Sequence, residues 1–448
     1  MRRILFIILS CLIFPNVTYA SIEFIDVVDP DNGSGTDYTS LSAWENSFGI
    51  IDLTSADTKV FSGTTTETLS DNVTVYQCRS GVYQSVTGTM THDTATQALV
   101  KSITAGASFE ANDRWYTNNT CNSANYFMIS DTGDSAIVVA KCRSTAGSAD
   151  TTAVTIDGFV TSATNYIKVW TDPNESYRHQ GKWDTNKFRI IVSSGWRTGT
   201  ITISDENVRI DGLQINNTGA NDNVSGGIII KSNENNMNIN ISNNIIRGVT
   251  NADINYYSGI SVFDNNGSGS IKNWNNIIYD FKTNSIAGAA LMDANDFIGA
   301  TGNPIIYSYN NTAVNTDFGY SQSAEVYITK NSMAYNCTDN YYGTFDATST
   351  NNLSGPGSDA DIPATNARNG VTVIFNDEAG DDFHLNTSDL GARDNGTSQV
   401  SELNFSNDID GENRNGAGQG WDVGADEVIH YMGKIRGTVK LKGDVKFR

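Results

Sequence analysis

The sequence predicts an all-β protein built mainly as a right-handed parallel β-helix, or solenoid, with an N-terminal capping region and a short C-terminal β-hairpin tail. Its 448 residues include 51 Asn and 40 Gly, which favour tight turns and weaken helices. Hydrophobic residues make up 38% of the chain and aromatic residues 10%, so a folded core is expected rather than disorder. A loose repeat in residues 151–355 selects the solenoid among the all-β folds.

Residues 1–20 have the pattern of a secretory signal peptide. Arg2 and Arg3 precede an apolar run from Ile4 to Phe14, and a cleavage pattern of small residues ends at Ala20. This run is shorter than the roughly 20 residues of a membrane-spanning helix, and no later run reaches that length. We therefore expect a secreted or cell-surface protein without a transmembrane segment.

Residues 21–150 are expected to form the N-terminal cap and the first coils. An Asp-rich turn opens the region, and the stretch from Ser40 to Glu45 predicts a short helix that Thr39 or Ser40 caps. Short apolar strands then alternate with Ser, Thr and Gly turns.

The cysteines predict one disulfide bond. Cys78, Cys121 and Cys142 lie close in sequence, whereas Cys337 is distant. An oxidising compartment favours one bridge among the first three, and the sequence does not choose the pair. The spacing of Cys and His does not fit a zinc site.

Residues 151–432 are expected to form the parallel β-helix and its closing coil. Strands that begin at Gly227, Gly259 and Gly288 recur every 32 and 29 residues. The offset from Gly227 to Asn244 is 17, and the offset from Gly259 to Asn276 is also 17. We expect Asn to occupy left-handed corners, with amides stacked from coil to coil. The residues predicted to point into the bore are Ile228, Ile230, Ile260, Val262, Ala289 and Leu291.

The C-terminal part carries two charged motifs. The first runs Asp408-Ile409-Asp410-Gly411-Glu412-Asn413-Arg414, and the second runs Asp422-Val423-Gly424-Ala425-Asp426-Glu427. The middle zone resembles the pectin-lyase-like right-handed β-helices, and this ending resembles that of secreted bacterial choice-of-anchor β-helix proteins. The resemblance implies the fold and leaves the function open, because such β-helices include polysaccharide lyases, glycoside hydrolases, surface proteins and phage tail fibres. Physically, Asp410 with Arg414, and Asp422 with Glu427, would close the last coil.

A carboxylate pair is the first candidate site. Aligning the coils on Gly259 and Gly288 places Asp264 and Asp293 at the same offset, one coil apart on an exposed face. That spacing suits a catalytic acid/base pair or a shared Ca²⁺, the one metal ion that we consider; no motif requires another cofactor. The alternative interpretation is that both are ordinary turn residues. Candidate substrate-binding residues beside the pair are Asp296, Tyr256 and Tyr257, whose rings would stack on sugars.

A basic cluster is the second candidate site. Polysaccharide lyases of the resembled fold use Arg or Lys as the base that removes the proton next to a uronate carboxyl, which implies a catalytic role for Arg178, His179 or Lys182. The alternative is a surface turn of mixed charge with Trp183 folded underneath.

Charge limits the partners. The formal net charge of -21 makes DNA and RNA poor partners. Residues 433–448 are the exception, since they hold six Lys and Arg against one acid in an alternating, strand-like pattern. This tail is expected to dock on its own chain, on a sister subunit or on a cell-surface component, and docking on a sister subunit would make an oligomer. The alternative is that the tail is solvated.

Two functional classes follow. We expect an extracellular surface or adhesive β-helix that interacts with a polysaccharide or cell-surface glycan. The alternative is a polysaccharide lyase or glycoside hydrolase acting on an acidic polysaccharide.

Overall fold

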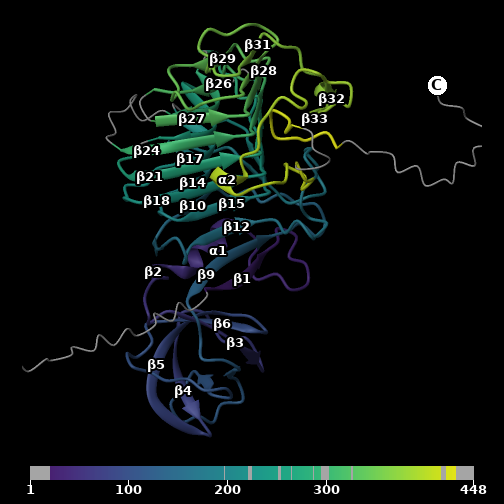
Figure 1. The fold of residues 1–448 in the computed structure, drawn as a ribbon. Helices are drawn as coiled ribbons and strands as arrows, with labels where there is room; N and C mark the ends of the chain where they lie inside the picture. Colours follow the sequence, from purple (N-terminus) through teal and green to yellow (C-terminus); the bar gives the residue numbers. More distant parts are fainter. Residues whose placement is uncertain are drawn as a thin grey trace, which may run out of the picture. The chain divides into compact units, whose positions relative to one another are not determined.

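The computed structural model describes residues 21–195, 197–219, 224–250, 254–263, 265–285, 287–293, 302–323, 326–414 and 420–429. The chain divides into two compact units, one formed by Met1–Phe24 and Ile51–Val138 and the other by Ile25–Ile50 and Val139–Arg448. We name them the barrel unit and the solenoid unit (Figure 1). The predicted signal peptide, Asp264, Asp296 and the basic tail lie outside the described residues.

The barrel unit is a closed antiparallel barrel, where the sequence had led us to expect a cap and first coils. After β2 (Ile51–Asp52), its strands pair in the order β3-β6-β5-β4-β7-β8. Their bounds are β3 Lys59–Thr65, β4 Val73–Arg79, β5 Val82–Asp93, β6 Gln97–Lys101, β7 Arg114–Tyr116 and β8 Phe127–Ile129. The rings of Phe61, Phe109 and Trp115 pack edge-on or tilted in its core, with centroids 4.8 to 5.8 Å apart.

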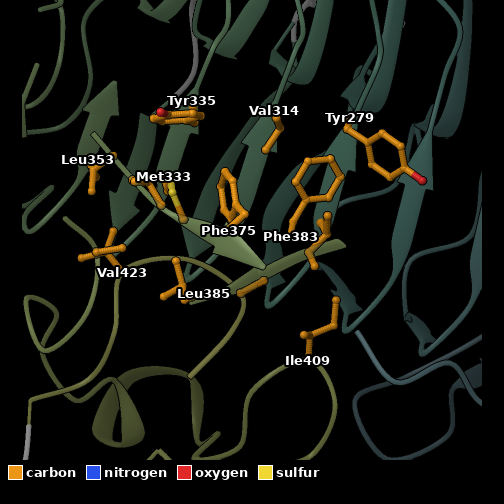
Figure 2. Close-up of a cluster of buried hydrophobic side chains, with 14 of the residues drawn as sticks. Tyr279, Val314, Met333, Tyr335, Leu353, Phe375, Phe383, Leu385, Ile409 and Val423 are labelled. Atoms are coloured by element: carbon orange, nitrogen blue, oxygen red, sulfur yellow. The ribbon is translucent and has the colours of Figure 1, made fainter. Parts of the chain in front are cut away.

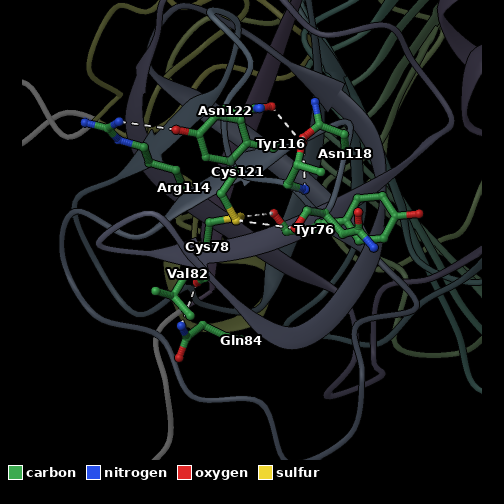
Figure 3. The surroundings of a disulfide bond; sticks show 11 residues. Tyr76, Cys78, Val82, Gln84, Arg114, Tyr116, Asn118, Cys121 and Asn122 are labelled. Carbon is green, nitrogen blue, oxygen red and sulfur yellow. Dashed lines mark hydrogen bonds between the residues drawn. A yellow bond between two sulfur atoms is a disulfide. The ribbon is translucent and has the colours of Figure 1, made fainter.

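One disulfide bond joins Cys78 on β4 to Cys121 in the segment between β7 and β8 (Figure 3). This confirms the prediction of a single bridge among the first three cysteines. Cys142 is free and buried, and Cys337 is also free.

The solenoid unit contains three long sheets, and consecutive strands of the chain enter them in turn. The first sheet has the order β1 (Ile22–Val28), β9 (Ala136–Cys142), β12 (Ile167–Trp170), β15 (Val208–Asp211), β18 (Met237–Ser242), β21 (Ser268–Trp274), β24 (Asn303–Tyr309), β27 (Val326–Lys330). The second has the order β10 (Val154–Ile156), β14 (Thr198–Ile203), β17 (Val224–Ile230), β20 (Tyr256–Val262), β23 (Gly288–Asp293), β26 (Phe318–Ser321), β29 (Asp339–Tyr342). The third has the order β13 (Arg189–Val192), β16 (Gln214–Asn217), β19 (Ile245–Arg247), β22 (Ile277–Tyr279), β25 (Thr312–Val314), β28 (Met333–Tyr335), β30 (Leu353–Gly355), β31 (Arg368–Asn369).

Each turn of the chain therefore adds one strand to each sheet, and strands of neighbouring turns pair in parallel from β12 onward. This arrangement is consistent with a β-solenoid, as the repeat predicted. The described part of the unit adds α1 (Leu41–Phe48), β11 (Phe159–Val160), β32 (Phe375–Asp377), η2 (Glu378–Gly380), β33 (Asp382–Leu385) and α2 (Val400–Leu403). Ser40, one of the two residues predicted to cap this helix, accepts the backbone N–H of Ala43 at the start of α1.

All six predicted bore residues are buried, each with at most 3% of its surface exposed: Ile228, Ile230, Ile260, Val262, Ala289 and Leu291. Ala289, however, packs in a separate cluster with Ile229 and Met292, which alternate with bore residues along their strands, so its assignment to the bore was wrong. Ile228 on β17 pairs with Ile260 on β20, which pairs with Leu291 on β23. Branched side chains thus stack in columns along the inside of the second sheet.

The alignment on Gly288, however, was wrong by two residues. Gly288 pairs with Tyr257 rather than with Gly259, and Asp293 therefore pairs with Val262. Asp293 is fully buried, not on an exposed face. The glycines have different roles: a Cβ at Gly227 or Gly259 would clash with an isoleucine of the third sheet, whereas a Cβ at Gly288 would clash with the Phe281 carbonyl in the preceding turn.

Asparagine forms the corner between the first and third sheets, as predicted. Asn243, Asn275 and Asn310 have φ values of 54°, 53° and 50°, in the left-handed region that Asn tolerates. The residue after each corner points inward, and its amide bonds the next coil: Asn244 Nδ2 donates to Asn276 Oδ1 at 3.0 Å.

The C-terminal segment covers the outer face of the third sheet. Figure 2 shows Phe375, Phe383 and Leu385, from the β32–β33 hairpin and its end, packed against buried side chains of that sheet such as Tyr279 and Val314. This packing is apolar, so it fixes the place of residues 371–428 on the solenoid.

Candidate functional site

A groove runs along the outer face of the first sheet, between β12, β15, β18 and β21 on one side and residues 402–411 on the other. It has two hollows that share Asp211, Ser242, Trp274 and Asn404. We name the larger, of about 580 Å³, the acidic hollow, because Asp408 and Asp410 line it. The other, of about 550 Å³, is the basic hollow, since Lys168, Arg209 and Lys272 line it. Figure 1 shows α2, whose last residues Glu402 and Leu403 line the basic hollow, beside this face.

Strand alternation creates the groove. In β12, Ile167 and Val169 are buried in the bore, so Lys168 and Trp170 must point outward. The same alternation in the next three strands produces two outward columns in register. The first column is Lys168, Arg209, Asn240 and Lys272, and the second is Trp170, Asp211, Ser242 and Trp274.

Cations of the first column lie against aromatic rings. Lys168 Nζ lies 3.6 Å from the centre of the Trp170 ring, and Arg209 Cζ lies 3.4 Å from the centre of the Tyr166 ring. Such cation–π contacts hold a charged group in place without neutralising it. Lys272 lies in the same column, two coils beyond Arg209.

Arg178 and Asp211 form an ion pair where the hollows meet. Arg178 Nη1 donates to Asp211 Oδ2 at 2.7 Å and to the Thr171 carbonyl at 3.0 Å. Burial alone would raise the pKa of Asp211, but the guanidinium and hydrogen bonds from Asn243 and Ser242 lower it. The pair is therefore fully charged at neutral pH, and Arg178 is held as a hydrogen-bond donor.

His179 is buried below the wall of the acidic hollow. Its Nε2 lies 2.9 Å from the Asn243 carbonyl, and its Nδ1 accepts the Gly181 N–H at 3.2 Å. These two contacts require the proton on Nε2. Burial and the Arg178 charge lower the pKa of His179 to about 3, so the ring is neutral and both nitrogens are occupied. This geometry suits a positioning role.

Lys182 lies apart from Arg178 and His179. Its side chain is 43% exposed, and Nζ lies 3.4 Å from Asp382 on β33. Trp183, expected under this loop, is partly buried and stacks with Arg247, whose Cζ lies 3.8 Å from the ring centre. The structure thus places two of the three predicted basic residues in the acidic hollow.

Tyr256 and Tyr257 lie on the second sheet, away from the groove. Tyr257 is fully buried, donates its hydroxyl to the Asn217 carbonyl and packs on Phe281 at 4.6 Å. Its ring is therefore closed to sugars. Tyr256 packs partly buried against a cluster that includes Val224.

The C-terminal segment supplies an aromatic wall and two carboxylates. Phe405 stacks on Trp274 with centroids 5.8 Å apart and an interplanar angle of 19°. Asp408 is buried and accepts backbone N–H groups of Glu412 and Glu427 at 2.7 and 3.0 Å. Burial and the neighbouring Asp410 carboxylate raise the pKa of Asp408.

His384 balances the negative charge of this segment. Its Nδ1 lies 2.6 Å from Asp382 Oδ1, and its Nε2 lies 3.4 Å from Asp410 Oδ2. Burial would lower the pKa of His384, but the bonds to Asp410 and Asp382 raise it to about 10. The ring is therefore an imidazolium at neutral pH, clamped between two carboxylates.

The closing motifs pair differently from our expectation. Arg414 is fully buried and bonds Glu427 at 3.2 Å and the corner residue Asn275 at 3.1 Å, while Asp410 pairs with His384. Asp422 and Glu427 do meet, as predicted: the Glu427 carboxylate accepts the backbone N–H of Asp422 at 2.8 Å. Both motifs thus fasten the C-terminal segment to the solenoid.

Among the residues that the structure describes, two groups of side chains have the geometry to hold a metal ion, and both include Asp410. Within each group the donor atoms lie within 4.8 Å of one another: Asp408, Asp410 and Glu412, and His384, Asp410 and Asp426. Because the His384 imidazolium already neutralises Asp410, a cation would have to displace a proton there. The donor set therefore favours an internal ion pair.

The groove itself was not predicted from the sequence. Three cations of the groove each lie between two bore residues of their strand, and this alternation predicts that their side chains point outward: Lys168, Arg209 and Lys272. Asp408 and Asp410 were noted, but their position against Trp274 depends on the packing of the C-terminal segment.

Comparisons with family models, with curated proteins and with solved structures find no match to this chain. Among the described residues, no helix combines the length and the apolar character needed to cross a bilayer.

Proposed function

We propose that this protein is a secreted or cell-surface right-handed β-helix that binds a glycan in the groove of its first sheet. The observation that carries the proposal is the second outward column, in which the rings of Trp170 and Trp274 stand on either side of Asp211 and Ser242. Sugar rings pack their apolar faces on aromatic rings and hydrogen-bond through their hydroxyl groups to polar side chains.

The sequence supports the extracellular assignment. The N-terminal pattern of residues 1–20 favours export. The resemblance of the middle zone to pectin-lyase-like β-helices, and of the closing motifs to those of secreted choice-of-anchor proteins, favours an exported, right-handed β-helix. Asn404, which is exposed, adds an amide group to the acidic hollow, and this suits a ligand rich in hydroxyl groups.

Binding of purified protein to a panel of polysaccharides, measured by calorimetry, tests the proposal. Trp274→Ala should weaken binding about fivefold, because a stacked ring contributes about 1 kcal/mol beyond its buried area. Tyr342→Ala removes a ring that is 46% exposed on β29 of the second sheet and should leave binding unchanged. Equal affinities of wild type and Trp274→Ala would place the glycan elsewhere.

A second candidate function is cleavage of an acidic polysaccharide by a lyase or hydrolase. Asp408 and Asp410 favour it, because burial keeps one carboxyl protonated while His384 keeps the other ionised, as an acid and a base require. Arg178 and His179 would then orient the substrate. Absorbance of unsaturated products and release of reducing ends from the same panel test this, with Asp410→Asn as the inactive variant; glycan binding without either product would refute it.

A further inference from the structure

The basic hollow has uncompensated positive charge on a protein whose net charge is -21. Two acidic residues line this hollow, and both are already paired. Asp211 bonds Arg178 at 2.7 Å, and Glu402 bonds Lys330 at 2.7 Å. Within the described part of the chain, neither Arg209 nor Lys272 forms an ion pair with a carboxylate. The field in the hollow is therefore positive, in contrast to that of the whole protein.

The cations are also ordered. Arg209 on β15 pairs in register with Asn240 on β18, which pairs with Lys272 on β21. Neighbouring strands lie about 4.8 Å apart, so the backbone positions of Arg209 and Lys272 lie about 10 Å apart, with the neutral residue Asn240 between them. Lys168 continues the column on the other side of Arg209 and keeps its charge against the Trp170 ring, so the stretch in which charged and neutral groups alternate runs from Arg209 to Lys272.

This order of charged, neutral and charged groups matches one kind of ligand. Ten ångströms is comparable with the length of an extended disaccharide, and the groove runs across successive strands, parallel to the stacking direction of the coils. Arg209 and Lys272 would each meet an anionic group two sugars apart, and Asn240 would bond the hydroxyls of the uncharged sugar between them.

We infer that the groove selects linear polysaccharides that carry one anionic group, a carboxylate or a sulfate, on every second sugar. The inference rests on the proposed function and narrows its ligand. It separates an alternating polymer from a polyuronate with a charge on every sugar, whose middle carboxylate would face Asn240 without a cation. It also excludes neutral chains as the preferred ligand.

Four size-matched oligosaccharides test the inference by calorimetry with the full chain. They are fragments of hyaluronan with one carboxylate per disaccharide, κ-carrageenan with one sulfate per disaccharide, polygalacturonate with one carboxylate per sugar, and neutral agarose. Hyaluronan or κ-carrageenan should bind about tenfold more tightly than either other chain, because a charge-assisted hydrogen bond contributes about 1.5 kcal/mol. Which of the two binds better identifies the anionic group.

Variants locate the effect. Lys272→Gln and Arg209→Gln should each cost about tenfold in affinity, Lys272→Arg should retain binding, and affinity should fall as salt rises. Lys282→Gln makes the same charge change outside the lining of both hollows and should be neutral. Asn240→Lys should gain affinity for polygalacturonate. Melting temperatures equal to that of wild type confirm that each variant is folded.

The outcomes separate the two proposals. Neutral agarose or polygalacturonate binding as tightly as the alternating chains would overturn the inference and leave glycan binding standing. Binding of none of the four chains and of no member of the polysaccharide panel would overturn both. If Lys272→Gln and Arg209→Gln both keep the preference for an alternating chain, then Arg209 and Lys272 do not recognise the anionic groups, and the inference about this column is refuted.

Discussion

The asparagine column between coils gives the sharpest test of the fold. Asn276 is fully buried, and its Oδ1 accepts two N–H groups of Asn244, the backbone and the side-chain amide, both at 3.0 Å. Its Nδ2 donates to the Ile241 carbonyl at 3.0 Å and to Asn311 Oδ1 at 2.9 Å. Asn276→Ala removes all four bonds and leaves their partners in a region that water does not reach.

A buried polar group left without a partner costs about 1 kcal/mol or more, so we expect Asn276→Ala to lower the free energy of unfolding by about 4 kcal/mol. Equilibrium unfolding in guanidinium chloride, followed by tryptophan fluorescence, measures the change as a lower midpoint of the solenoid transition. Asn266→Ala is the matched control, because that Asn is exposed; its Nδ2 donates to Asn233 Oδ1 on the neighbouring coil at 3.1 Å, where water can replace the bond. A loss below about 1 kcal/mol in Asn276→Ala would mean that the amide column does not hold the coils together.

Three further outcomes are expected. Ile260→Asp should prevent folding of the solenoid unit, since an unpaired carboxylate in the bore costs several kcal/mol. Ile305→Asp is the control and should be tolerated, because the Ile305 side chain is 36% exposed. A soluble Ile260→Asp variant with the melting temperature of the wild type would contradict the register. Because the pKa of His384 is about 10 in the fold and about 6.5 in an unfolded chain, its stabilisation is complete below pH 6.5 and is lost as the pH rises toward 10. The difference in unfolding free energy between wild type and His384→Gln should shrink over that range, and a constant difference would show that the ring is not charged. Replacing Cys78 and Cys121 by Ser should destabilise the barrel unit by about 4 kcal/mol, as expected for a bridge that spans 43 residues; unchanged denaturation of that unit with or without reductant would disagree.

Local chemistry explains what the sequence analysis could predict. Asn243 and Asn275 were assigned to left-handed corners because Asn tolerates that backbone and can bond its counterpart one coil away, and both properties belong to the residue itself. Ile228 and Ile260 were placed in the bore because one face of each strand must be apolar. These features depend on a few neighbouring residues.

The rest depends on contacts between distant residues. The short strands of residues 51–138 alternate with Ser and Thr turns in the same way as solenoid strands, so an antiparallel barrel and a set of first coils look alike in sequence. Asp408 and Trp274, 134 positions apart, line the same acidic hollow because the C-terminal segment packs on the third sheet through apolar side chains. No short motif encodes such a contact.

The stacking of coils also has a mechanical consequence. The backbone hydrogen bonds of all three sheets and the amide bonds of the asparagine column run from one coil to the next, so a pulling force along the stacking direction stretches them end to end. β1, β10 and β13 at one end of the sheets, and β27, β29 and β31 at the other, have a paired strand on one side, whereas an interior strand has one on each side. Under tension the solenoid should therefore lose coils from its ends, one at a time, and each detached coil lengthens the chain while the remaining coils stay paired.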